Sequence, residues 1–135
     1  MLDRQLSHLP DPAGVFPSSG YTHVVSGRGR LAAVSGQMAF DPEGELVGAG
    51  DPEAQARQVF TNMSRCLAAA GGSFDNVIKL TYFVTDAAFI PRILAVRDEF
   101  IDTKCPPAST VVQVAALYQP DLLLEVDALA LLDDE

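Results

Sequence analysis

Residues 122–132, LLLEVDALALL, alternate between two sets of side chains, and this alternation strongly constrains the fold. Successive side chains of an extended strand point to opposite faces, so residues two apart share a face. One face is entirely apolar and carries Leu122, Leu124, Val126, Ala128 and Ala130. The other face carries Leu123, Glu125, Asp127, Leu129 and Leu131. The segment is therefore predicted to be a strand that covers a core with one face and carries two carboxylates on the other.

Glu125 and Asp127 are candidates for chemistry because a carboxylate inside an apolar strand is costly to bury. Without a partner, burial of such a charge opposes folding strongly. Groups kept in that situation are often found at acid–base sites. The alternative is that this face of the strand is simply wetted by solvent. Spacing alone leaves both interpretations open.

Residues 51–72, DPEAQARQVFTNMSRCLAAAGG, predict the clearest helix. Asp51 is suited to cap it, Pro52 suits the first helical position, and Glu53 favours the positive end of the helix dipole. Apolar residues recur at spacings of three and four and define one buried face. They are Val59, Phe60, Met63, Cys66, Leu67 and Ala70. The glycine pair at 71–72 is expected to end the helix.

The rest of the chain predicts further strands and one more helix. Residues 21–40 predict a β-hairpin around GRGR, and Gly36 inside its second strand indicates a bulge or a close backbone approach. The remaining elements are a strand at 76–86, a helix at 89–101, and two strands at 109–117 and 122–132 joined by a turn at 118–121. Residues 1–20 hold three prolines and two glycines and are expected to be an irregular lead-in.

The resulting order ββαβαββ predicts a single domain, residues 1–135, of the α+β class. Two helices of this kind would cover one face of a mixed sheet. The opposite face then also needs cover, and self-association is the simplest source of it.

The formal net charge of −9 at pH 7 disfavours a nucleic acid or an anionic membrane as a partner, because phosphates would be repelled. The N-terminus lacks the pattern of a signal peptide, and no apolar run is long enough to span a membrane. With two cysteines and no disulfide framework, a cytoplasmic protein is predicted. His8 and His23 are isolated and no metal-ligand spacing occurs, so no metal site is predicted.

The stretch CPPASTVVQVAAL, residues 105–117, places Ser109 and Thr110 at the mouth of a strand, where binding residues are common. Period two puts Ser109, Val111 and Gln113 on one face. If this strand pairs with the last one through the turn at 118–121, Glu125 lies nearer Gln113 than Ser109. A ligand could still bridge Glu125 and Ser109.

Several segments together resemble the Rid family, the YjgF-type enamine/imine deaminases that are also labelled endoribonuclease L-PSP. They are GYTHVV, VSGQMAFDPEGELVG, DPEAQARQVFTNM, NVIKLTYFVTD, PAS followed by VVQVAAL, and LEVDALA, in the family's order and spacing. The resemblance implies a chorismate-mutase-like fold and a homotrimer around a central barrel-like core. It also implies ligand clefts between subunits and hydrolysis of 2-imino acids without a metal or organic cofactor.

The family's site residues can be carried over one by one. A tyrosine near the N-terminal strand corresponds to Tyr21, the glycine of SGQ to Gly36, and the glutamate that positions water to Glu125. In the family an arginine binds the substrate carboxylate in bidentate fashion. Here Ser109 follows Pro-Ala in its place, and Val111 stands where a small residue or cysteine is usual.

The missing arginine shapes the functional hypotheses. Without a cation, a bound carboxylate would be desolvated and unpaired, so handling of 2-imino acids is expected to weaken by orders of magnitude. One hypothesis is a Rid-type hydrolase acting on a less acidic substrate, with Glu125 orienting water and Ser109 as a neutral donor. The other is a binding module for a small metabolite or a protein partner, without chemistry.

Overall fold

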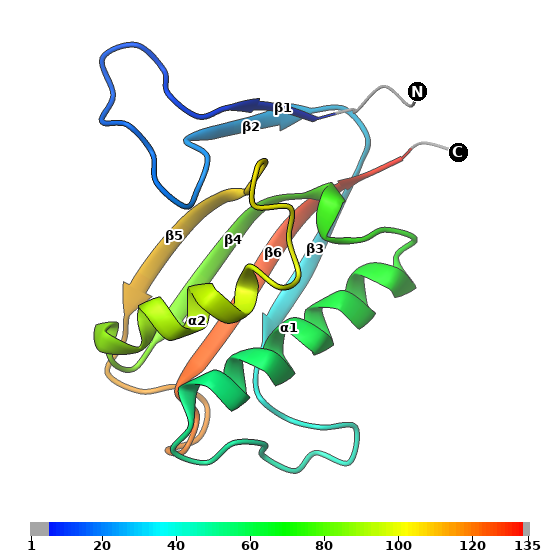
Figure 1. Ribbon diagram of the computed structural model, residues 1–135. Helices are drawn as coiled ribbons and strands as arrows, with labels where there is room; N and C mark the ends of the chain where they lie inside the picture. The colour runs from blue at the N-terminus through cyan, green and yellow to red at the C-terminus, as the bar shows by residue number, and fades with distance from the viewer. Residues whose placement is uncertain (1–5, 134–135) are drawn as a thin grey trace.

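The fold is built on a four-stranded mixed sheet, shown in Figure 1 as a computed structural model that describes residues 6–133. Its strands lie in the order β3-β6-β4-β5. They span β3 (Arg30–Gln37), β6 (Leu124–Leu132), β4 (Val77–Val84) and β5 (Ala108–Gln113). β6 runs antiparallel to both of its neighbours, whereas β4 and β5 are parallel.

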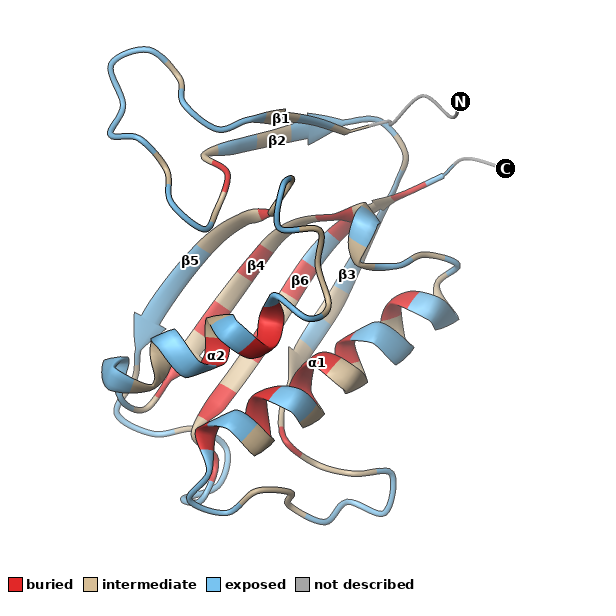
Figure 2. Cartoon of the chain, in the orientation of Figure 1, coloured by how far each residue is buried: buried red, intermediate tan, exposed pale blue. Residues whose placement is uncertain are grey.

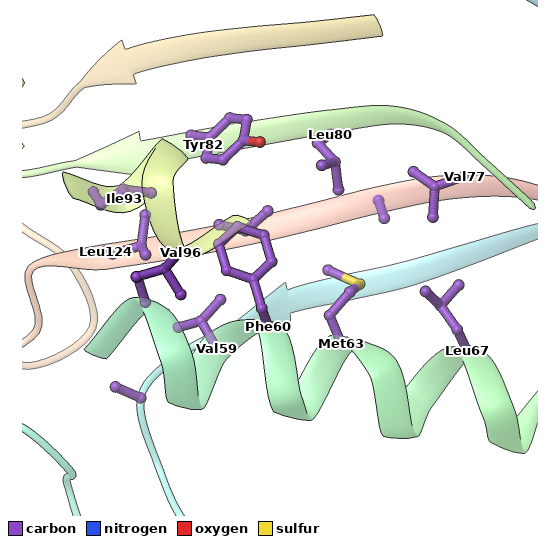
Figure 3. Packing of buried hydrophobic residues seen from close by; sticks show 14 of the residues in the cluster. Val59, Phe60, Met63, Leu67, Val77, Leu80, Tyr82, Ile93, Val96 and Leu124 are labelled. Carbon is purple, nitrogen blue, oxygen red and sulfur yellow. The ribbon is translucent and has the colours of Figure 1, made fainter. Parts of the chain in front are cut away.

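Two helices, α1 (Pro52–Ala69) and α2 (Ile90–Arg97), cover one face of this sheet (Figure 1). The buried residues lie between the helices and the sheet (Figure 2). Figure 3 shows apolar side chains of α1 and α2 packing against those of β4 and β6. The core includes Val59, Phe60, Met63, Leu67, Leu80, Tyr82, Ile93, Val96, Leu124 and Val126. The α+β prediction, with two helices on one face of a mixed sheet, is confirmed.

The start of α1 is as its sequence predicts. The Asp51 carboxylate accepts hydrogen bonds from the backbone N–H groups of Glu53 and Ala54, both at 3.1 Å, and Pro52 opens the helix. These bonds satisfy donors that have no partner inside the helix. The helix ends before the glycine pair, where Gly71 takes a positive φ of 91°.

β6 alternates as predicted. Its even-numbered residues, 124 to 132, are buried under the helices, and its odd-numbered residues are half-buried or exposed. Glu125 lies opposite Phe83 and Asp127 opposite Thr81 on β4. Both carboxylates therefore occupy the face of the sheet that the helices leave uncovered, called the open face below.

Two predictions for the N-terminal part were wrong. The stretch expected to be irregular contains a short strand, β1 (Leu6–Leu9), which pairs with β2 (Val24–Gly27) in a separate two-stranded sheet. β2 and β3 do not form the predicted hairpin, because β3 pairs with β6 instead. The chain changes direction between them near Gly29, whose φ is 146°. Residues 1–5 of the lead-in lie outside the described residues.

The expected pairing of the last two strands was also wrong. β4 lies between β5 and β6, and residues 114–123 connect the end of β5 to the start of β6. Parallel β4 and β5 are linked through α2, since parallel neighbours need a long crossover connection. α2 ends at Arg97, earlier than predicted, and two single-turn 3₁₀ helices, η1 (Phe74–Asn76) and η2 (Ala87–Phe89), flank β4.

Within residues 6–133, no helix has the length and apolar character needed to cross a membrane.

We expect Gln55→Leu to lower the free energy of unfolding by about 3 kcal/mol. Gln55 is fully buried on α1, and its amide bonds the carbonyls of Gly48 and Asp121 and the N–H of Leu123 at 2.8–3.1 Å. Leucine would leave these three backbone groups without partners. Urea unfolding measures the change.

The matched control is Gln58→Leu on the same helix, because Gln58 bonds only the side chain of Asn62 among the described hydrogen bonds. Gln58→Leu should lower the free energy of unfolding by less than about 1 kcal/mol. Equal losses in the two variants would contradict the anchoring role of Gln55.

Candidate functional site

Gly36 and Glu125 lie together on neighbouring strands. The register between β3 and β6 shifts between the pairs Val34–Ala128 and Gln37–Val126, so β3 carries a bulge at residues 35–36. This confirms the bulge predicted at Gly36. Bulges re-aim backbone and side chains and are common beside active sites.

The Glu125 carboxylate lies directly over the Gly36 backbone. A Cβ placed on Gly36 would overlap Oε2 of Glu125 and fall 2.7 Å from its Cδ. Only glycine therefore leaves room for the carboxylate in this position. Glu125 is half-buried, and within residues 6–133 no ion pair holds it. This half of the candidate site offers a positioned acceptor next to accessible backbone.

Tyr21, Ser109 and Val111 lie elsewhere. Ser109 pairs with Leu80 and Val111 with Tyr82, whose side chains point to the helix-covered face. Both are on the edge strand β5, so they remain partly exposed: Ser109 is half-buried and Val111 is 38% exposed.

Tyr21 is held beside the start of this strand. The next residue, Thr22, donates two hydrogen bonds to the segment before β5. Its backbone N–H donates to the carbonyl of Pro107 at 3.2 Å, and its hydroxyl donates to the carbonyl of Pro106. The ring of Tyr21 meets that of His23 edge-on, with centroids 5.1 Å apart. Tyr21 and Ser109 thus belong to one end of β5, next to the lead-in.

The predicted site residues therefore fall into two groups on opposite faces of one sheet. Gly36 and Glu125 are on the open face, and Ser109 and Val111 are on the helix-covered face at its edge. A ligand that bridged Ser109 and Glu125 within one chain, which the sequence analysis left open, would have to pass through the sheet. A site containing both groups needs two copies of the chain.

Sequence reasoning did not select Tyr82, which lies close to Ser109, or Arg97, which lies close to Tyr82. Arg97, at the end of α2, is only 3% exposed, and its Nε and Nη2 donate to one Asp98 oxygen at 3.2 and 2.9 Å. Tyr82 of β4 is 1% exposed, and its hydroxyl has no hydrogen-bond partner among the described residues. One signal was present in the sequence: Arg97 follows Ile93 by four residues and so falls on the buried helix face.

The side chains of Tyr82 and Arg97 influence each other electrostatically. Burial raises the pKa of Tyr82, while the Arg97 guanidinium and the Ser109 hydroxyl partly offset that rise. Burial also acts against the charge of Arg97, but Tyr82 and Asp98 outweigh it, so the pKa of Arg97 is raised. Arg97 therefore stays a cation inside the protein.

Gly36 also lines a surface groove between the end of β3 and α1. The groove is lined in part by Met38, Asn62, Arg65 and Cys66, and it includes neither Glu125 nor Ser109. No three His, Cys, Asp or Glu side chains gather as metal ligands anywhere in residues 6–133.

Comparison with known proteins identifies the family. The family model described as Endoribonuclease L-PSP matches residues 13–132. The chain belongs to the Rid family. This Rid-family chain is 34% identical over 129 residues to the RutC family protein slr0709 of Synechocystis, which covers 95% of this chain and 94% of the relative. It is 33% identical to the 2-iminobutanoate/2-iminopropanoate deaminase of Capra hircus, covering 96% of this chain and 90% of that protein.

A solved structure agrees with this membership. The Rid-family protein YyfB from Yersinia pestis, described as of unknown function, superposes with a TM-score of 0.85 at 32% identity. The match covers 95% of this chain and 99% of the Yersinia chain. The chorismate-mutase-like fold expected for a Rid protein is thereby confirmed.

We expect Gly36→Ala to destabilise this Rid-family chain by about 1–3 kcal/mol, because the new methyl group collides with Glu125. Glu125→Ala should remove most of that cost. A double-mutant cycle in urea should therefore give a coupling above about 1 kcal/mol between the two positions. Additive effects would show that the carboxylate does not lie over the glycine.

Proposed function

We propose that the chain assembles as a homotrimer and that its clefts between subunits bind a small metabolite and hydrolyse a C=N bond in it. The observation that carries this proposal is the separation of Glu125 and Ser109 onto opposite faces of one sheet. In a cleft between copies, Glu125 and Gly36 of one subunit meet Tyr21, Ser109 and Val111 of the next.

The open face supports self-association. Leu31 is 67% exposed, and Leu129 and Val112 are each 40% exposed, on strands β3, β6 and β5. In the register of the sheet these side chains point to the same face as Glu125. Apolar surface that stays solvated is costly, and contiguous patches of it mark interfaces. A second copy would cover this face and supply the missing half of the site.

The chemistry assigned to this cleft is water addition to an imine carbon. Glu125 accepts a hydrogen bond from the attacking water and directs its oxygen to that carbon, as a general base does. A C–O bond forms, the nitrogen takes up protons, and the C–N bond breaks to release ammonia and leave a carbonyl. The reaction changes no oxidation state, so it needs no redox cofactor.

The substrate proposed is one other than the usual 2-imino acids. Position 109 carries a neutral hydroxyl, and Val111 makes the wall apolar. The net charge of −9 adds a general repulsion of anions. A neutral imine or an amide-like compound fits this wall better than a carboxylate does.

We expect the native protein to show weak or no hydrolysis of 2-imino acids in a coupled assay, and Ser109→Arg to raise kcat/KM by at least about tenfold. A charged partner for the carboxylate contributes on the order of 1.5–3 kcal/mol, and 1.4 kcal/mol is tenfold. Gain of activity would indicate that the remaining groups are intact.

The matched control is Thr110→Arg, which places the same charge one residue on, toward the open face, where Thr110 now accepts from Lys79. It should give no gain. Glu125→Gln in the Ser109→Arg background should abolish the gain. Strong 2-imino acid hydrolysis by the native protein would contradict the argument from position 109.

The absence of a cation at position 109 also favours a second candidate, a binding module without chemistry. Thermal-shift screening across neutral imines, enamines and cyclic amides separates the two. Ligand stabilisation without turnover would favour the module, and turnover that disappears in Glu125→Ala would favour the hydrolase.

A further inference from the structure

The Tyr82 hydroxyl is a buried polar group without a hydrogen-bond partner among the described residues. The Tyr82 ring packs in the core, 6.4 Å between centroids from Phe60. Its hydroxyl oxygen, red in Figure 3, lies on the side of the ring nearer Leu80. Leu80 is the β4 residue that pairs with Ser109. A buried hydroxyl left without a partner opposes folding, and phenylalanine would fill the same space without that cost.

Two polar side chains, those of Arg97 and Ser109, lie near this hydroxyl. The Arg97 guanidinium and the Ser109 side chain both lie close enough to Tyr82 to lower its pKa against the effect of burial. A guanidinium can only donate hydrogen bonds, whereas each hydroxyl can also donate its own proton. All three groups can donate a hydrogen bond, and although the two hydroxyl oxygens can also accept, the Tyr82 hydroxyl has no hydrogen-bond partner among the described residues.

We propose that the hydroxyls of Tyr82 and Ser109, with the Arg97 guanidinium behind them, form a subsite that binds an uncharged carbonyl oxygen of the ligand, of the kind an amide carries. The placing of this subsite in a ligand cleft rests on the proposed function. Ser109 would form the solvent-accessible end of the subsite, because it is half-buried on the edge strand while Tyr82 and Arg97 are enclosed.

The charges in the cluster favour a neutral acceptor over a carboxylate. Arg97 is already paired with Asp98, whose side chain is 46% exposed beside it. A ligand carboxylate placed here would meet the Asp98 charge and compete for the same guanidinium. A carbonyl oxygen meets no such repulsion, and the buried cation polarises the hydroxyls that donate to it.

The test measures binding of a matched pair of probes, 2-oxobutanamide and 2-oxobutanoate, by isothermal titration at pH 7. We expect the amide to bind at least about tenfold more tightly than the acid. Tyr82→Phe and Ser109→Ala should each weaken amide binding about tenfold, the usual effect of one lost hydrogen bond. Ser109→Arg should reverse the preference toward the acid.

Melting temperature separates this role from a structural one. Tyr82→Phe should melt at the same temperature as the native protein or higher, because it removes an unpartnered hydroxyl. The matched control is Tyr118→Phe, which removes the hydroxyl of a tyrosine that is 77% exposed near the other end of β5. It should change neither binding nor melting.

Three results would overturn the subsite: equal or tighter binding of the acid, binding of neither probe, or unchanged amide binding in Tyr82→Phe. A lower melting temperature of Tyr82→Phe would also overturn it, since the hydroxyl would then be structural. If the native protein hydrolyses no imine but the amide preference and its loss in Tyr82→Phe are found, the proposed function fails and the subsite stands.

Discussion

Burial of one face of β6 under the two helices organises the rest of the molecule. β6 is central in the sheet, so its alternation sets which side chains of β3 and β4 share each face. The apolar set packs on α1 and α2 and supplies much of the hydrophobic stabilisation. The same alternation forces Glu125 and Asp127 onto the open face. A one-residue slip would exchange the two sets, so the register of β6 is strongly specified.

Separation of the two faces governs what a single chain can do. The Glu125 carboxylate packs on the Gly36 backbone on the open face, whereas Ser109 is at the edge of the helix-covered face. Neither group can reach the other through a packed sheet. Assembly would be a condition for the proposed chemistry, and the exposed apolar side chains beside Glu125 would be covered by the same contact.

A buried cation beside Tyr82 comes from a helix. Arg97 is enclosed by α2, β4 and the lead-in, with its Nη2 3.9 Å from where a Cβ on Gly20 would lie. Its pairing with Asp98 leaves the cluster nearly neutral. The neutral Ser109 therefore lies near a buried cation that is already paired with Asp98, whereas the family resemblance implies a carboxylate-binding arginine at position 109 itself.

Local patterns predicted the local features. The cap and proline of α1, the alternation of β6 and the bulge at Gly36 depend on residues that are near in sequence or on one strand. Strand order could not be read in this way, because insertion of β4 between β5 and β6 depends on the crossover through α2. Because the sequence analysis paired β5 directly with β6, it placed Ser109 and Glu125 wrongly relative to each other. The Tyr82–Arg97 cluster was missed because it joins β4, α2 and β5, and β1 because four residues carry too little pattern.

Cross-linking between Ser109→Cys and Glu125→Cys in one chain, with Cys66 and Cys105 replaced by serine, tests the central claim directly. The sheet separates the two positions within a subunit, and the proposed cleft brings them together between subunits. A short bismaleimide should therefore give covalent dimers and trimers on a denaturing gel, whereas each single cysteine variant should give far fewer. Cross-linked monomers alone would contradict the account, because they would place both residues in one site of a single chain.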